Sequence, residues 1–332
     1  MKRNIFRNPD LQLRMEQDGF VTMPFLNQDE IRRLRLLFER NRPPSAPAYG
    51  FHVSLDDPRE DIVRHIAGSI AEICRRPVLE TFDRSKVFTS SFVIKESNPD
   101  SLVPVHQDWT FVDESKYCSL TCWIPLVAVN VSNGGLGVIK GSHKFYQFSR
   151  CSPSPQVPTP IGNHMFSIFP YLHIPDLSAG SAIIFDNRTF HGSPPNISGL
   201  PRIAAGIGIT HFEADLQHNY YVPGEEVPKT ETYRINPDFF FKYNNGKLSA
   251  LFNDGRKPER LPLLSTSEFG MPVIDSATLD NWIRFSGNEV NPELEAMLPG
   301  GRQIAAKGEA TNGNGKVSGR NGIVQWIRKI FG

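Results

Sequence analysis

Two histidines and one aspartate have the residue types and the spacing of a metal-binding set. His106 and Asp108 are separated by a single residue, and His191 lies far downstream. On an extended strand, residues i and i+2 point to the same side, so His106 and Asp108 can reach one ion together. Two imidazoles and one carboxylate suit a divalent iron that is held on one face and open on the other. The set therefore predicts an iron centre at which oxygen can be activated.

An arginine, Arg202, follows the second histidine in the sequence. A guanidinium group can bind a carboxylate through two parallel hydrogen bonds. Arg202 beside the metal therefore indicates a dicarboxylic co-substrate. Each of these residues is a weak signal alone, because the chain has nine histidines and His-x-Asp triplets also arise by chance. The prediction depends on their combination.

These side chains need strands to bring them together, and the sequence offers several. Residues rich in β-branched and aromatic side chains form five short runs. They cover residues 87–94, 118–126, 136–139, 181–185 and 203–210. Turn-forming clusters separate them, and no helical pattern lies between them. The pattern predicts a mainly β fold with flanking helices, an antiparallel sandwich or jelly roll.

Within this fold, the functional residues fall at strand ends. His191 comes shortly after the run 181–185, and Arg202 begins the run 203–210. We expect a hairpin through residues 194–201 to return Arg202 beside His191. A proline-rich loop, residues 151–160, is inserted between strands and is a candidate for an active-site lid.

The N-terminal residues 1–85 are predicted to be helical. Asn27 and Glu30 have the spacing of a capping box, and Asp57-Pro58 has the pattern of a second helix start. The jelly-roll core is expected at about 86–215, followed by a C-terminal elaboration, 216–299, in which the only assigned element is a short helix after Asn236. Together, residues 1–299 are predicted to form one domain.

The C-terminal end of the chain differs in composition. Residues 300–321 are rich in glycine and polar residues, which predicts a flexible linker. Residues 322–332 form a basic amphipathic tail, with apolar residues at helical spacing: Ile323, Trp326, Ile327, Ile330 and Phe331. Contact with a membrane surface or a protein is one interpretation of this tail. Packing on its own domain or remaining disordered are the others.

Bulk composition excludes several classes of protein. A formal net charge of +1 gives no general reason to bind nucleic acid. The four cysteines contain no CxxC pair, and so low a density favours a reducing compartment. Neither a secretory signal nor an apolar stretch long enough to span a membrane is visible. We therefore predict a cytoplasmic location. Oligomeric state is left open.

Several motifs, taken in order, resemble the phytanoyl-CoA dioxygenase (PhyH) family. The matching segments are Asp18-Gly19-Phe20-Val21, His106-Gln107-Asp108, Trp123-Ile124-Pro125-Leu126, Asn133-Gly134-Gly135-Leu136, Gly141-Ser142-His143-Lys144, His191-Gly192-Ser193 and Arg202. The resemblance implies a double-stranded β-helix (a cupin-like jelly roll), Fe(II), and 2-oxoglutarate and O2 as co-substrates. It also implies hydroxylation of an unactivated carbon of a small-molecule, acyl or lipid-like substrate, with release of succinate and CO2.

The resemblance also suggests a role for individual residues. His106, Asp108 and His191 look like the iron ligands, and Arg202 with Ser193 looks like the pair that holds the distal carboxylate of 2-oxoglutarate. Trp123 matches a family tryptophan near the co-substrate, with core packing as the alternative. Lys95 resembles a family lysine near the pocket, and a solvated surface lysine is the alternative for it.

Two further residues bear on the implied chemistry. His143 is interpreted as a structural residue of its turn and not as a fourth ligand. Relatives that halogenate have a small residue in place of the carboxylate ligand, so Asp108 favours hydroxylation.

Two other functions fit the same residues. The first is a jelly-roll protein that binds metal and ligand without turnover. The second is a zinc hydrolase on a cupin-like barrel, which would leave Arg202 and Ser193 without a role.

Overall fold

The computed structural model describes residues 3–42, 48–224 and 226–298. The predicted linker, 300–321, and the predicted tail, 322–332, lie outside the described residues. None of the helices in the described part of the chain is both long and apolar enough to cross a membrane.

Most of the strands belong to one antiparallel sheet, here called the major sheet. Its strands lie in the order β1 (Phe20–Pro24), β7 (Ser181–Asp186), β5 (Ser119–Pro125), β9 (Arg202–His211), β3 (Ser85–Lys95) and β2 (Phe51–Val53). The two longest strands, β3 and β9, pair along almost their whole length. This pairing gives the centre of the sheet a fixed register.

A smaller antiparallel sheet, the minor sheet, lies across the interior from the major sheet. It contains β4 (Val103–His106), β8 (His191–Ser193) and β6 (Gly137–Val138) in that order. One buried cluster joins Val138 of β6 to Trp123, Ile183, Phe185 and Ala204 of the major sheet. Since the two sheets enclose this cluster, the predicted mainly β jelly-roll fold is confirmed.

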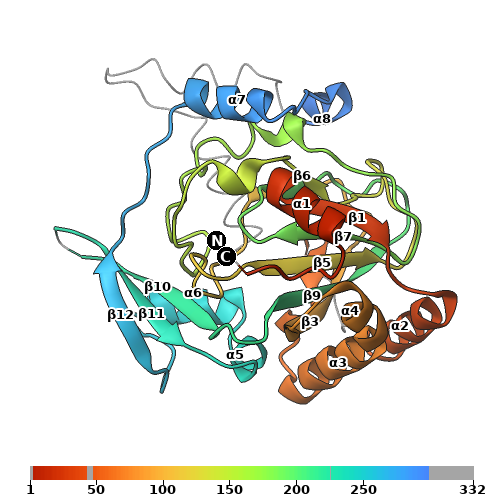
Figure 1. Ribbon diagram of the computed structural model, residues 1–332, viewed down its shortest axis with the longest axis horizontal. Coiled ribbons are helices and arrows are strands. Elements are labelled where there is room, and N and C mark those ends of the chain that lie inside the picture. Colours follow the sequence, from red (N-terminus) through yellow and green to blue (C-terminus); the bar gives the residue numbers. More distant parts are fainter. Residues whose placement is uncertain (1–2, 43–47, 225, 299–332) are drawn as a thin grey trace.

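The opposite face of the major sheet is covered by helices (Figure 1). These are α1 (Pro9–Asp18), α2 (Gln28–Arg40), α3 (Glu60–Ile73) and α4 (Arg75–Thr81). Apolar side chains of α2 and α3 pack on strand residues in the largest buried cluster, which includes Leu34, Phe38, Ile66, Ile70, Phe92, Ile94, Leu120 and Ile207. Alternate residues of β5 therefore face either this layer or the interior between the sheets.

The five strands predicted from the sequence are confirmed, with shifts of one or two residues at their ends. The prediction of a helical N-terminal part, 1–85, is wrong in two places, because β1 and β2 form the outer strands of the major sheet. The capping box of Asn27 and Glu30 is present. The next long helix begins at Glu60, after the predicted start, and the Asp57 carboxylate there accepts from the guanidinium of Arg59, at 2.7 and 2.9 Å.

The C-terminal part contains a third sheet that the sequence analysis did not find. It is antiparallel, in the order β10 (Gln217–Val222), β11 (Lys229–Arg234) and β12 (Leu263–Glu268). The remaining helices are α5 (Asp238–Lys242), α6 (Asn245–Asn253), α7 (Ser276–Phe285) and α8 (Pro292–Ala296), and short 3-10 helices span Ser54–Asp56, Ser142–Lys144 and Phe169–Tyr171. Helix α5 confirms the predicted short helix after Asn236. The loop 151–160 packs on this part through Cys151 and Val157, which contact Phe269.

Candidate metal centre

The three residues of the predicted metal set come together at one end of the minor sheet. His106 ends β4 and is the register partner of His191 at the start of β8. Asp108 follows two residues after His106, beyond the strand. One side-chain donor atom from each of the three residues lies within 4.8 Å of the others, and the two imidazole centroids are 4.2 Å apart. Among the described residues, no other group of metal-binding side chains meets this criterion.

Main-chain hydrogen bonds orient both imidazoles in the same way. Nδ1 of His106 lies 2.9 Å from the carbonyl oxygen of Pro104, and Nδ1 of His191 lies 3.0 Å from that of Thr189. A carbonyl oxygen can only accept, so Nδ1 carries the proton in each ring. Nε2 then presents a lone pair, which is the form that binds a metal. The fold therefore sets the tautomer of each histidine through the residue two positions before it.

Burial favours the neutral form of the first histidine. Desolvation, with a smaller contribution from His191, lowers the pKa of His106 to about 4. His106 is therefore uncharged at neutral pH and does not need to lose a proton before it binds a metal.

The main chain around Asp108 is fixed on both sides. Its N–H donates to the carbonyl of Asn187 at 3.1 Å, and its carbonyl accepts from Nε of Arg150 at 2.6 Å. Arg150 is itself buried and forms a bidentate ion pair with Glu114, at 2.5 and 2.9 Å. The Oδ1 atom of Asp108 lies 3.7 Å from Nε2 of His191, which leaves space for an ion between them.

Residues from two of the motifs that resemble the family, Gly19 and His143, lie next to Thr189, which precedes His191 by two residues. Gly19 has a φ of +82°, and a Cβ atom there would lie 2.4 Å from Nδ1 of His143 and 2.8 Å from Oγ1 of Thr189. Thr189 also supplies the carbonyl that accepts from His191. Only glycine fits this contact. His143 is outside the metal group and lies 3.1 Å from the carbonyl of Glu16 through Nε2.

Arg202 is on the other side of the interior, in the major sheet. The predicted hairpin from His191 is wrong, because β8 pairs with β4 and β6, whereas Arg202 on β9 pairs with Lys95 on β3. Arg202 is 2% exposed. Its Nη1 donates to the carbonyl of Val93 at 3.2 Å, and its Nε has no hydrogen-bond partner among the described residues. Burial lowers its pKa to about 9, which leaves it charged at neutral pH.

Lys95 is 0% exposed, so the alternative of a solvated surface lysine is wrong. Its ammonium donates to Oγ of Ser193 at 2.5 Å and to the carbonyl of Pro194 at 2.6 Å. Burial, and the neighbouring charge of Arg202, hold the pKa of Lys95 well below its usual range. Because Ser193 lies two residues after His191 on β8, Lys95 connects the major sheet to the strand that carries the metal set.

Trp123 packs in the core, which is one of its two interpretations, and it also lies beside Arg202. It belongs to the buried cluster between the two sheets, and its ring lies 5.1 Å from Cζ of Arg202. A cation over an indole ring is stabilised by the charge distribution of the ring. Trp123 therefore packs the core and supports the guanidinium at the same time.

The polar groups of this region that lack a partner could bind an anion next to a metal. Neither Lys95 nor Arg202 forms an ion pair with a carboxylate among the described residues. A buried ion without a counterion has an effective penalty of several kcal/mol. The unpartnered Nε of Arg202 is thus a donor that fits a ligand carboxylate, and the free Nε2 atoms of the histidines fit a divalent metal.

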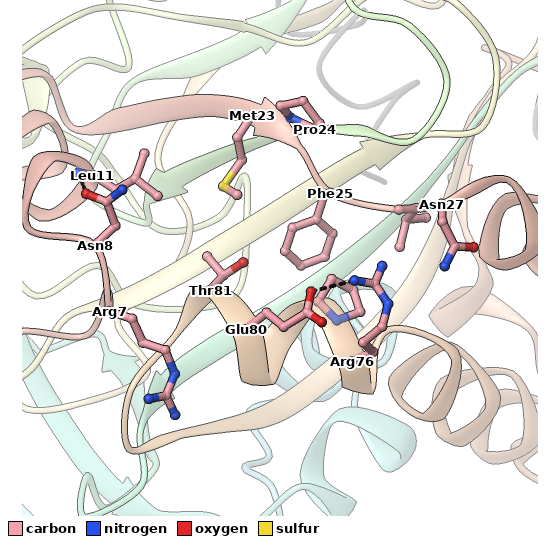
Figure 2. A pocket seen from close by; sticks show the side chains of 12 residues that line it. Arg7, Asn8, Leu11, Met23, Pro24, Phe25, Asn27, Arg76, Glu80 and Thr81 are labelled. Carbon is pink, nitrogen blue, oxygen red and sulfur yellow. Dashed lines mark hydrogen bonds and ion pairs between the residues drawn. The ribbon is translucent and has the colours of Figure 1, made fainter.

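A separate surface groove of about 440 Å³ lies between α1, β1 and α4 (Figure 2). Its apolar side chains include Leu11, Met23 and Phe25. The charged groups are already paired, since Arg76 binds both Glu30 and Glu80. None of the predicted site residues lines this groove, so it is no part of the metal centre.

Sequence reasoning missed the residues that support the ligands. Thr121, Asn187 and Arg150 contact Asp108 or its neighbours. Each is a single polar residue in a strand, a turn or a loop, with no repeated pattern to mark it. The short period-two run of β5 gave the one available signal, because it places Thr121 and Trp123 on the same face.

Comparison with known proteins gives both a family and a set of structural likenesses. The carbocyclase SnoK from nogalamycin biosynthesis, described as non-heme and alpha-ketoglutarate dependent, is 19% identical, with a TM-score of 0.44 over 66% of this chain and 88% of that chain. EvdO2 from Micromonospora carbonacea var. aurantiaca, complexed with 2-oxoglutarate, is 19% identical, with a TM-score of 0.42 over 64% and 94%. HygX from Streptomyces hygroscopicus, with nickel, 2-oxoglutarate and hygromycin B, is 14% identical, with a TM-score of 0.40 over 61% and 86%.

None of the curated proteins matches the chain. The family assignment therefore depends on a sequence match to the family model described as phytanoyl-CoA dioxygenase (PhyH), which covers residues 15–204. This match spans more than half of the chain and includes every predicted metal ligand and Arg202. The chain therefore belongs to the phytanoyl-CoA dioxygenase (PhyH) family, and it is an oxygenase.

Proposed function

We propose that this protein hydroxylates an unactivated carbon of a small organic substrate, with release of succinate and CO2. In this proposal His106, Asp108 and His191 hold Fe(II). Arg202 and Ser193 hold the distal carboxylate of 2-oxoglutarate. Lys95 and Trp123 position these two residues.

The observation that supports the proposal most strongly is the convergence of three donors with their lone pairs free. Both imidazoles use Nδ1 to bind a main-chain carbonyl, at 2.9 and 3.0 Å, so both Nε2 atoms are available for the same ion. Asp108 contributes the negative charge. With all three ligands from one end of the minor sheet, the opposite face of the ion is left for the co-substrate and oxygen.

Arg202, Lys95 and Ser193, here called the anion side, have the charge and the hydrogen-bond donors that a carboxylate needs. Arg202 is charged, buried and short of a partner at Nε. Lys95 donates to Oγ of Ser193. Because that oxygen accepts from Lys95, the proton of the Ser193 hydroxyl is free to point to a ligand. A carboxylate between Arg202 and Ser193 would receive hydrogen bonds, one of them charge-assisted, from two buried side chains.

When bound, Fe(II) with 2-oxoglutarate and O2 supplies the oxidising power that cleaves a strong C–H bond. The chain provides the geometry. Main-chain hydrogen bonds fix the imidazoles, Arg150 holds the carbonyl of Asp108, and Trp123 closes the space under the guanidinium. In this proposal, these contacts would support a co-substrate on one side of the ligand set, with its charged end held by buried side chains.

The experiment that tests the proposal is the formation of succinate and of an oxygenated product. Purified protein with Fe(II), ascorbate, 2-oxoglutarate and candidate substrates should release succinate, and ¹⁸O2 should label the product. Asp108→Ala should abolish both. Hydroxylation is rejected if the product is cyclised or epimerised and carries no label. Binding of 2-oxoglutarate without its consumption would support the alternative of a ligand-binding protein without turnover.

A further inference from the structure

The two oxygens of the Asp108 carboxylate have different surroundings. Oδ1 faces Nε2 of His191 at 3.7 Å. Oδ2 lies 3.0 Å from Oγ1 of Thr121. The side chain of Asp108 is 29% exposed, so its orientation depends on such contacts more than on tight packing.

The Thr121 hydroxyl lies between this carboxylate and a second polar side chain. Its Oγ1 is 2.9 Å from Oδ1 of Asn187. A hydroxyl has one proton, and a carboxylate and an amide oxygen can both only accept. Thr121 therefore cannot satisfy both neighbours when the amide presents its oxygen. In that orientation the Nδ2 of Asn187 is also buried without a hydrogen-bond partner among the described residues.

A half-turn of the Asn187 amide removes the conflict at Thr121 and puts an acceptor, in place of a donor, in the position without a partner. The two ends of an amide have nearly the same shape, and the hydrogen-bond network decides which end faces which neighbour. With Nδ2 towards Thr121, the amide donates to Oγ1, and the hydroxyl proton goes to Oδ2 of Asp108. The carbonyl end then lies in the position without a partner, and a buried carbonyl lacks a partner more often than a buried N–H does.

The main chain fixes both ends of this arrangement. Asn187 is 0% exposed, in the turn between β7 and β8. Its N–H donates to the carbonyl of Ser119 at 3.0 Å, and its carbonyl accepts from the N–H of Asp108 at 3.1 Å. Thr121 is on β5, held on both sides by β7 and β9. Asn187 therefore holds Asp108 twice, once through the main chain and once through Thr121.

We propose that Asn187 and Thr121 form a one-way hydrogen-bond relay onto Oδ2 of Asp108, which leaves Oδ1 as the single metal-binding oxygen of that carboxylate. Both are positioning residues. The relay sets the carboxylate in its binding orientation before the metal arrives, and it prevents bidentate binding that would occupy a position on the open face. This inference rests on the proposed role of Asp108 as a metal ligand.

The test uses metal binding and not turnover. Co(II) is titrated into the wild type, Thr121→Val and Thr121→Ser without co-substrate, and its visible absorption is recorded. Valine has the shape of threonine without the hydroxyl, so Thr121→Val should weaken Co(II) about 10- to 100-fold and change the absorption spectrum, which reports the ligand set. Thr121→Ser keeps the hydroxyl and should restore both affinity and spectrum.

Asn187→Asp tests the direction of the relay. If the amide donates to Thr121, an aspartate cannot replace it, and Co(II) affinity should fall. If the amide accepts from Thr121, an aspartate carboxylate keeps that acceptor, and Co(II) affinity should not fall. Retained affinity in Asn187→Asp would therefore overturn the proposed direction.

A matched control is Thr210→Val, which removes another buried hydroxyl of the major sheet. Oγ1 of Thr210 donates to the carbonyl of Cys118 at 2.8 Å, so this change should leave Co(II) binding unaltered. Wild-type affinity and spectrum in Thr121→Val would overturn the relay. Equal losses in Thr121→Val and Thr121→Ser would also overturn it. Wild-type Co(II) affinity in Asp108→Ala would instead reject the proposed function, so the two failures are distinguishable.

Discussion

The metal side of this centre (His106, Asp108 and His191) and the anion side differ in the structural elements that position their residues. The proposed metal ligands are at the ends of short strands in the minor sheet and in the turn beyond, where main-chain carbonyls orient the two histidines. The two cationic side chains of the proposed anion site, Lys95 and Arg202, are in long paired strands of the major sheet, and only Ser193 is on β8 of the minor sheet. Lys95 and Arg202 are register partners on β3 and β9, so two buried basic side chains lie side by side without a carboxylate from the described residues.

This difference predicts how each side responds to change. The metal side depends on many contacts of moderate strength, so loss of a supporting contact should weaken metal binding by degrees. The anion side depends on charge, so loss of one group should change co-substrate binding steeply. Removal of an unpartnered buried charge should also leave the fold stable, because the desolvation penalty disappears with the charge.

The largest effect is expected from removal of a metal ligand. Asp108→Ala should weaken Fe(II) by more than about 100-fold, the upper range for loss of a supporting contact, and succinate formation should stop. Anaerobic equilibrium dialysis with Fe(II) measures the first quantity. A loss of Fe(II) affinity of only about 10- to 100-fold, the range for a supporting contact, would mean that Asp108 is not a ligand.

The second prediction concerns Arg202. Arg202→Met should weaken 2-oxoglutarate by about 2–5 kcal/mol, with Fe(II) affinity unchanged and thermal stability of the unliganded protein equal or higher. Calorimetric titration of the metal-loaded protein with 2-oxoglutarate gives the first value. As a control, Arg35→Met removes a guanidinium that binds the carbonyl of Leu126 away from the site. A large loss of stability in Arg202→Met would contradict the view that the Arg202 guanidinium is a buried charge without a counterion.

Gly19 offers a way to damage the metal side alone. Gly19→Ala places a Cβ 2.4 Å from His143 at a φ of +82°, which should destabilise the fold by about 1–3 kcal/mol. Since the contact also involves Thr189, metal binding should weaken while the anion side keeps its geometry. Gly199→Ala is the matched control, with a φ of +85° and open space around it. Equal effects of the two changes on Fe(II) affinity would rule out the contact as the cause.

The last prediction concerns a buried histidine that belongs to neither side and whose substitution should leave metal and co-substrate binding unchanged. Burial lowers the pKa of His218 to about 3, below its value of about 6.5 in the unfolded chain. The unfolded state therefore binds more protons below pH 6.5, and stability falls as the pH decreases from there towards 3. Substitution of His218 by Asn should reduce the loss of unfolding free energy between pH 7 and pH 5 by about 2 kcal/mol. Urea unfolding at both pH values checks this, and equal losses in both proteins would contradict it.

The sequence predicted those parts of the fold that have a local pattern. Strands β3, β5, β7 and β9 are runs rich in apolar and β-branched residues, and the metal set is recognisable from residue types. Strand β12 is exposed along its whole length, so it has no apolar side to detect. The pairing of Arg202 with Lys95 could not be derived either, because strand partnership depends on the whole sheet. Thr121 and Asn187 acquire their roles only through contacts between distant segments.

The central claim is that the two sides form one site for a chelated dicarboxylate. Anaerobic Fe(II)-loaded protein is titrated with 2-oxoglutarate and, separately, with 2-oxobutyrate, which chelates metal equally but lacks the distal carboxylate. The visible charge-transfer absorption of the chelate reports binding. We predict that 2-oxoglutarate saturates the wild-type protein at a much lower concentration than 2-oxobutyrate does. In Arg202→Met this preference should disappear. Equal affinities for the two acids in the wild type would contradict the account.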